Sequence, residues 1–219
     1  LFGPYNCHNG PQNQHQYSEE LQVLGNTEHW SFVVGAFYFF ERASEHNDQG
    51  FTFVLPGGQA ALNLTPLSTF GGETKSKAVF GQVSYRPAAF ADRLEFTGGA
   101  RYTQDDKEFF SNQFLQPGKA SSSNTSWLAS VNYQFTGETM GYARVSTGYK
   151  AGGFSPRAPF LAEFQPEKAT AYELGLKAEW FDRRLRTNLS LYQTDFKDLQ
   201  VQQFQSGTGG SVGYTVNAA

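Results

Sequence analysis

The sequence predicts an all-β fold, namely part of an antiparallel, up-and-down transmembrane β-barrel. Three observations predict this fold class. Apolar and polar residues alternate along most of the 219 residues, and the connections between the alternating segments are by turns short and long. No run of residues approaches the roughly 20 consecutive apolar positions of a membrane-spanning helix, so an α-helical membrane protein is excluded.

The alternation defines about nine strands, eight of them complete and the last only begun. In chain order they occupy residues 17–24, 30–41, 77–86, 93–102, 126–135, 139–149, 171–180, 184–191 and 211–219. Between 171 and 180, for example, Tyr172, Leu174 and Leu176 share one parity, and Glu173, Gly175 and Lys177 share the other. Such a pattern predicts a strand with one apolar and one polar face. Two segments depart from it, because apolar residues interrupt their polar parity: Val33, Phe37 and Phe39 in 30–41, and Leu128 in 126–135.

The connections show a strict asymmetry of length. The short ones lie at 25–29, at 87–91, around Gly137 and around Asp182, and the longer ones at 42–76, 105–124, 150–168 and 198–210. Both ends of a soluble sandwich meet the same water, which gives no reason for every second connection to be long. Outer-membrane barrels have tight turns on the periplasmic side and long loops outside, and they produce this asymmetry.

Charge and aromatic residues indicate which face meets lipid. A Lys or Arg that faces lipid at mid-depth costs roughly 2–4 kcal/mol, so the basic residues of the strands are predicted to face the lumen. They are Arg93, Arg101, Lys177, Arg184 and Arg186. Large aromatic residues lie toward the strand ends and are predicted to form girdles at the membrane boundary. They are Trp30, Tyr38, Phe40, Tyr102, Trp127, Phe135 and Trp180. A soluble β-sandwich with these aromatic residues in its core is the alternative.

Two regions are expected along the chain. Residues 1–16 are a polar leading segment, rich in Gly, Pro, Asn and Gln, and are predicted to be an external loop. Residues 17–219 are predicted to be a partial barrel that ends within a strand. An open sheet edge is not tolerated in hydrocarbon, so the sequence predicts an arc of a larger barrel.

Two long strings in the second half of the chain are similar to a known family. GYARVSTGYKAGGF (141–154) and FQPEKATAYELGLKAEWFDRRLRTNLSLYQTDFKDLQV (164–201), together with KAVFGQVSY and LEFTGGARYTQDDK upstream, closely resemble the barrel of TonB-dependent outer-membrane receptors. The resemblance covers most of the chain from Tyr17 onward. It implies a barrel of about 22 strands in the bacterial outer membrane, closed by an N-terminal plug domain.

The same resemblance implies partners and a transported ligand. It predicts contact with outer-membrane lipid, contact with TonB through a plug domain that these 219 residues do not include, and energised uptake of a ferric siderophore or another small nutrient. A passive porin or an adhesin barrel is one alternative, and a soluble carbohydrate-binding sandwich is another. A barrel protease or lipase is a third.

Candidate ligand-binding residues lie where strand 139–149 meets its long connection. They are Arg144, Tyr149, Lys150, Phe154 and Arg157. Aromatic and cationic side chains there are predicted to bind an anionic, ring-bearing ligand by stacking and charge-assisted hydrogen bonds. A solvated loop is the alternative, and the glycines around Lys150 lack the Gly-Lys-Ser/Thr ending of a phosphate-binding loop. Asp105, Asp106 and Glu108 form an acidic cluster, read either as a Ca²⁺ site or as a solvated loop.

Other classes of function find no support in the composition. The formal net charge is −3, so no nucleic-acid partner is predicted. A single Cys excludes a disulfide framework, and the four His residues show no metal-ligand spacing. No Ser/His/Asp trio is discernible in the sequence order, so neither an enzyme nor a cofactor is predicted.

Overall fold

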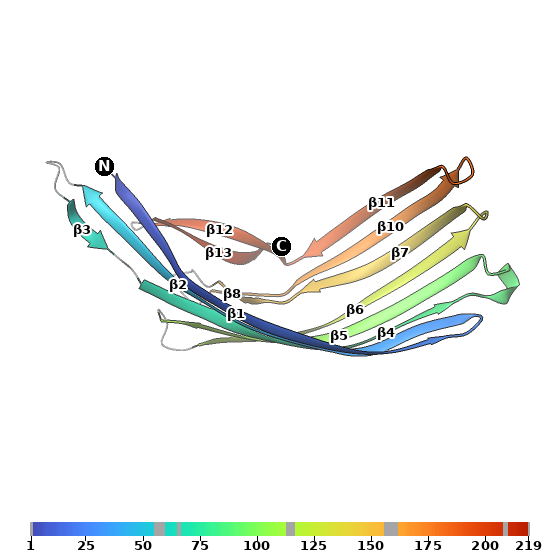
Figure 1. Cartoon of the computed structure of the whole chain (residues 1–219), viewed down its shortest axis with the longest axis horizontal. Helices are drawn as coiled ribbons and strands as arrows, with labels where there is room; N and C mark the ends of the chain where they lie inside the picture. The colour runs from blue at the N-terminus through green and yellow to red at the C-terminus, as the bar shows by residue number, and fades with distance from the viewer. Residues whose placement is uncertain are drawn as a thin grey trace.

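The chain folds almost entirely as β-strands. The computed structural model describes residues 2–54, 60–64, 67–112, 117–155, 162–207 and 210–218. Eight long strands follow one another across a single curved sheet (Figure 1). In sheet order they are β1 (Phe2–Asn26), β2 (Trp30–Val54), β4 (Leu67–Tyr85), β5 (Leu94–Ser111), β6 (Gly118–Gln134), β7 (Thr139–Lys150), β10 (Glu167–Trp180) and β11 (Leu185–Lys197).

Neighbouring strands of this sheet are antiparallel throughout, and their order across the sheet is their order along the chain. This is the predicted up-and-down topology. Strand β3 (Ala60–Leu64) pairs with the end of β2. Two small hairpins complete the described structure: β8 (Gly153–Phe154) with β9 (Glu163–Phe164), and β12 (Leu199–Gly207) with β13 (Gly210–Ala218). The only helical segment described is a 3₁₀ turn at Ala88–Phe90, and no described helix has the length and apolarity needed to cross a membrane.

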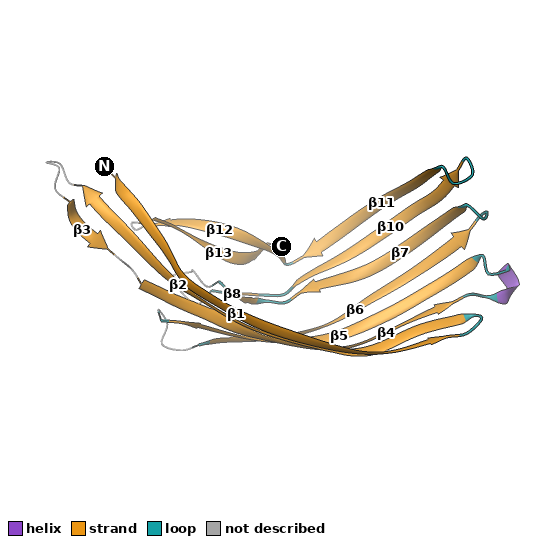
Figure 2. Cartoon of the chain, viewed as in Figure 1, coloured by secondary structure: helices purple, strands orange, loops and turns teal. Residues whose placement is uncertain are grey.

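The short connections all lie at one end of the sheet, hereafter the short-turn end (Figure 2). Local backbone geometry explains their tightness. Phe181, Asp182 and Arg183 have φ values of 54°, 54° and 67°, so three successive residues in the left-handed region reverse the chain between β10 and β11. Ala91 and Asp92 adopt the same region between β4 and β5. The opposite end of the sheet, hereafter the long-connection end, carries β3 and the two small hairpins.

The strands are longer than the alternation predicts. Residues 1–16 were predicted as an external loop, but β1 begins at Phe2, and 12–16 pair with 41–45 of β2. The predicted connection 42–76 begins as strand to Val54, and 105–124 contains the ends of β5 and β6. The reason is that polar residues occupy both parities in much of these parts, so the backbone ladder continues where no apolar parity reveals it.

The last predicted strand has a different partner from the one expected. Residues 211–219 correspond to β13, as predicted. It pairs with β12, which lies within the predicted connection 198–210, and not with β11. The left-handed φ of 56° at Asp198 separates β12 from the end of β11.

The two faces of the sheet differ in polarity and in exposure. We call the face with the apolar parity the outer face and the opposite one the inner face. From Lys119 to Ala129 of β6, every outer-face residue is exposed and every inner-face residue is partly buried. The inner face is therefore the more enclosed side of the curved sheet.

The outer face carries an apolar band between two rows of aromatic residues. Toward the short-turn end the row is Trp30, Tyr85, Phe96, Tyr133, Phe135 and Trp180, and toward the other end it is Tyr17, Tyr38, Phe40, Tyr102, Trp127 and Tyr172. All of the predicted girdle residues lie in these rows. Neighbouring rings also touch, as in the stacked pair Trp30–Tyr85 with 4.3 Å between ring centroids.

The aliphatic residues between the aromatic rows are exposed. The exposed fractions of Leu174, Leu189 and Leu191 are 61%, 67% and 72%. In a soluble sandwich these leucines would be buried in the core between two sheets, so the described residues do not form one. The observed fold is the predicted one, a partial up-and-down barrel wall.

Arg101, Lys177 and Arg186 lie on the inner face, as predicted. Arg93 and Arg184 belong to the short turns instead, where their backbone N–H groups donate to Phe90 and Phe181.

Candidate ligand-binding site

The connection that follows β7 folds back over the inner face of the sheet. Gly152 makes this approach possible, because a Cβ atom there would lie 2.5 Å from the carbonyl oxygen of Phe164. Ser155 then donates its backbone N–H to the carbonyl of Ala162 at 3.0 Å, closing the β8–β9 hairpin. The chain therefore bends sharply after β7.

The hairpin places an aromatic ring against the sheet. Phe154 stacks on Phe109 of β5, with 6.3 Å between ring centroids and 24° between ring planes. Phe109 and Phe70 are only 7% and 8% exposed, and they are the largest buried apolar side chains among the described residues. All three side chains line a groove of about 330 Å³ whose other wall is polar and includes Gln14 and Glu45. We call this groove the outer site because it lies toward the long-connection end of the sheet, although it belongs to the inner face.

A polar cluster lies beside the outer site. The hydroxyl of Tyr149 donates to Ser122 Oγ at 2.6 Å, and the nearly buried Asp105 lies within reach of the same ring. Lys107 is packed against Gly153 of the hairpin. Burial lowers the pKa of Lys107 below its ordinary value, Asp105 partly opposes this shift, and the positive charge of Lys150 reinforces it. Burial also raises the pKa of Tyr149.

The predicted site residues are only partly brought together. Tyr149 and Phe154 contact the inner wall beside the groove, and Lys150 is exposed at the end of β7 but close enough to influence Lys107. Arg144 lies in a different groove. Arg157 lies outside the described residues.

Sequence reasoning missed the strand residues that complete the site. Asp105, Lys107 and Phe109 share the inward parity of Arg101, but they were assigned to a loop. The possible Ca²⁺ cluster is split by the pleat, since Asp106 accepts from Ser121 on the outer face while Asp105 points inward. The described residues contain no group of three or more His, Cys, Asp or Glu side chains arranged to hold a metal ion.

The β12–β13 hairpin is hydrogen-bonded to the segment that contains the β8–β9 hairpin. Asn217 of β13 accepts the backbone N–H of Gln165 at 2.7 Å and donates to the carbonyl of the same residue at 2.9 Å. It also donates to the carbonyl of Asp198 at 2.8 Å. Gln200 of β12 donates to the carbonyls of Ala151 and Gln165. These bonds tie the β12–β13 hairpin to the segment that carries Phe154.

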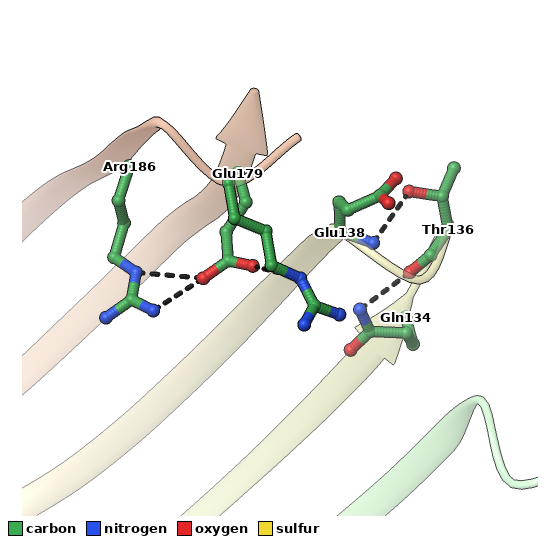
Figure 3. A network of polar contacts seen from close by, with 6 residues as sticks. Gln134, Thr136, Glu138, Glu179 and Arg186 are labelled. Atoms are coloured by element: carbon green, nitrogen blue, oxygen red, sulfur yellow. Dashed lines mark hydrogen bonds and ion pairs between the residues drawn. The ribbon is translucent and has the colours of Figure 1, made fainter. Parts of the chain in front are cut away.

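The short-turn end has its own polar network (Figure 3). Glu179 accepts from Arg186 Nε at 3.0 Å and from its Nη2 at 2.5 Å. Gln134 donates to the Thr136 carbonyl, and Thr136 Oγ1 accepts the backbone N–H of Glu138. Each of these contacts lies within one hairpin and stabilises its turn.

Two charged residues of β10 meet an aromatic residue of β7. Glu173 accepts from the Tyr142 hydroxyl at 2.5 Å, and Lys177 Nζ lies 5.5 Å from the centroid of the Tyr142 ring. Tyr142 of β7 therefore contacts both residues, Glu173 through its hydroxyl group and Lys177 through its ring.

Comparisons with known proteins identify a family and solved structures with the same architecture. A family model described as TonB dependent receptor-like, beta-barrel matches residues 3–219. The ferric yersiniabactin uptake receptor FyuA from Yersinia pestis is similar in structure, with a TM-score of 0.71 and 22% identity over 90% of this chain and 30% of that one.

Two further solved structures show the same likeness. The copper transporter OprC gives a TM-score of 0.70 at 15% identity, covering 94% of this chain and 34% of that one. The siderophore receptor PiuA from Acinetobacter baumannii gives 0.69 at 14% identity, again over 94% of this chain and 34% of that one. The chain thus spans about a third of the length of these structures, and at such low identities the likeness concerns the fold.

Proposed function

Because the chain belongs to the TonB-dependent receptor β-barrel family, we propose that it forms part of the wall of a receptor that takes up a scarce small ligand, a ferric siderophore above all. Receptors and transporters make up this family, and its members bind TonB together with siderophore or metal ligands. The family match disfavours a passive porin, an adhesin and an enzyme.

In this proposal the apolar band lies in the lipid of the bacterial outer membrane, where the family is located. The short-turn end faces the periplasm and the long-connection end faces outward, because periplasmic turns are the short ones in such barrels. The inner face then lines the lumen.

The sheet is one arc of a larger barrel in the same proposal. Its first and last strands, β1 and β11, each have a single neighbour along the sheet. Unpaired backbone groups are not tolerated in hydrocarbon, so further strands complete the ring. The proposed contact with TonB runs through a plug domain inside that ring.

The observation that carries the proposed ligand class is the packing of Phe154 over the inner face. The outer site joins three phenyl rings to a polar wall, and Tyr149, Lys107 and Lys150 stand beside it. Phenyl rings with ammonium groups beside them bind an anionic, ring-bearing molecule by stacking and charge-assisted hydrogen bonds. Ferric siderophores include molecules of this chemistry.

Uptake by the intact receptor tests the proposal. A strain without the receptor gene is grown on a panel of ferric siderophores, each as the sole iron source, to find the one whose use depends on the gene. Uptake of radiolabelled iron with that siderophore is then measured for a receptor that carries Tyr149→Ala, Lys150→Ala and Phe154→Ala together. We expect the apparent affinity to fall about tenfold or more, because each lost contact contributes roughly 0.5–2 kcal/mol.

The matched control is Lys119→Ala, which removes a lysine from the outer face at the same height as the outer site. It leaves uptake unchanged if the inner face carries the ligand. Normal uptake by the triple variant at equal receptor levels, or dependence on the gene with no siderophore in the panel, contradicts the proposed ligand class.

A further inference from the structure

Two lysines face each other on the outer face of the β10–β11 hairpin. Lys168 and Lys197 occupy directly opposite positions at the long-connection end of the two strands, and both are exposed. Opposite residues of an antiparallel pair have Cβ atoms only about 4.5–5.5 Å apart, so two ammonium groups there repel each other. Asp195 lies on the same face of β11, but its carboxylate accepts from Gln193 Nε2 at 3.0 Å. Within the described part of the chain, neither lysine forms an ion pair.

The other like-charged pair of the sheet shows how such repulsion is relieved. Glu73 of β4 lies opposite Glu108 of β5, also on the outer face. Lys75 Nζ lies 2.6 Å from Oε1 of Glu73, and Lys119 Nζ lies 2.6 Å from Oε1 of Glu108. Each of these carboxylates therefore has its own counter-ion. Among the strand pairings that the structure describes, the two lysines of β10 and β11 are the like-charged pair that lacks one.

Toward the short-turn end, the same two strands present a strip of apolar side chains. The outer-face pairs in that direction are Thr170–Asp195, Tyr172–Gln193, Leu174–Leu191 and Leu176–Leu189. All four leucines are exposed. The strip thus changes from ammonium groups through a tyrosine to leucines, which is the order of polarity along a membrane lipid from its headgroup to its acyl chains.

The height of the two lysines matches a lipid headgroup. Lys168 precedes Tyr172 of the aromatic row by four residues, which is about 13 Å at about 3.3 Å per residue, or about 9 Å along the membrane normal at a tilt of about 45°. The headgroup layer extends roughly 5–8 Å beyond the hydrocarbon on each side. A lysine carries its charge on a flexible four-carbon stem, so both ammonium groups can reach into this layer from its outer limit.

We propose that Lys168 and Lys197 together bind the phosphate group of a membrane lipid in the leaflet at the long-connection end, and that its acyl chains pack along Leu174 and Leu191. A phosphate between two ammonium groups replaces their repulsion with charge-assisted hydrogen bonds. The lipid thereby supplies the counter-ion that this hairpin lacks. The inference rests on the proposed function only in that the outer face meets membrane lipid and the long-connection end faces outward.

Native mass spectrometry of the intact, detergent-solubilised receptor tests the site, with diphosphoryl lipid A as the probe and the same lipid without its phosphates as the reference. We expect the wild type to bind the phosphorylated lipid about tenfold or more tightly than the reference lipid. Lys168→Gln and Lys197→Gln should each weaken binding of the phosphorylated lipid about tenfold, as expected for one lost charge-assisted hydrogen bond. The reference lipid should bind the wild type and both variants alike.

A melting measurement separates this role from a purely structural one. In lipid-free detergent, Lys168→Gln removes the repulsion between the two lysines, so the variant should melt at the same temperature as the wild type or above it. The phosphorylated lipid should then raise the melting temperature of the wild type more than that of the variant, because a ligand that binds the folded state stabilises it. An equal rise for both proteins contradicts the proposal.

The matched control is Lys119→Gln, which removes from the same face a lysine that already has a carboxylate partner. It should leave lipid binding unchanged. Equal weakening by Lys119→Gln would reduce the effect to overall charge, and equal binding by the wild type and both site variants would show that another part of the receptor neutralises the lysine pair. Displacement of the lipid by inorganic phosphate would assign the lysines to a free ion. Each of these results overturns the proposal, whereas the proposed ligand class fails separately, in the uptake assay.

Discussion

The strongest prediction concerns two adjacent residues of β11 that point to opposite faces. Leu189 lies on the outer face in the middle of the apolar band, opposite Leu176, and 67% of its side chain is exposed. Ser190 lies on the inner face opposite Gly175. The same substitution at the two positions therefore places the same charge either in lipid or in water.

The expected difference is large. An arginine that faces lipid at mid-depth costs about 2–4 kcal/mol, and a lumen-facing one costs little. Leu189→Arg should thus lower the folded-to-unfolded ratio by about 30-fold to 1,000-fold, at about 1.4 kcal/mol per factor of ten. Ser190→Arg should change it by less than about threefold.

Equilibrium unfolding of the intact receptor in phospholipid vesicles, followed by tryptophan fluorescence over a urea gradient, measures both free energies. The gradient must be traversed in both directions, so that unfolding is shown to be reversible. Equal losses at the two positions, or a larger loss for Ser190→Arg, would refute the assignment of the two faces.

Three further predictions follow from the outer site. The lowered pKa of Lys107 means that the folded state binds its proton less tightly than the unfolded state, so stability rises as the pH approaches the ordinary value of 10.5, and Lys107→Met should flatten that rise in pH-dependent unfolding. Gly152→Ala should open the β8–β9 hairpin and increase its cleavage in limited proteolysis, whereas Gly148→Ala, with 3.8 Å to its nearest neighbour, should not. Asn217→Leu removes three hydrogen bonds worth about 0.5–1.5 kcal/mol each and should speed amide exchange in the β12–β13 hairpin, unlike Gln203→Leu on the exposed side of β12.

The sequence predicted the membrane-facing half of each strand well. Leu174 lies on the apolar outer face and Lys177 on the polar inner face. Because the two faces meet different environments, apolar and polar residues alternate, and this period of two identifies the strand and its faces. The asymmetry of the connections gave the order of the strands. The family resemblance named the same class that the family model matches.

The outer halves of the strands were beyond this reasoning. Ser121 on the outer face and Ser122 on the inner face are both polar, as are Gln14 and Glu41 on the inner face, so the sequence carries no apolar alternation there. Backbone pairing alone extends the strands. Lys107 and Phe109 lie in such a part of β5, and they were therefore assigned to a loop and missed as site residues.

The positions of the site residues depended on packing between distant segments. Phe154 and Phe109 are far apart in the sequence, and only the inward fold of the β8–β9 hairpin makes them neighbours. Arg144 was grouped with Tyr149 because they are close in sequence, yet Arg144 lines a different groove and Tyr149 lies beside the outer site, bonded to Ser122. Proximity along one strand was a poor guide to a site built across five.

The length of β2 has a mechanical consequence. Its 25 residues extend about 80 Å at about 3.3 Å per residue, whereas a strand tilted by about 45° crosses the hydrocarbon within about 9–11 residues. In the proposed orientation, much of the remainder extends beyond the membrane as hydrogen-bonded sheet. A molecule that arrives from outside meets strands whose conformational entropy was already lost on folding, so binding requires little additional ordering of the chain.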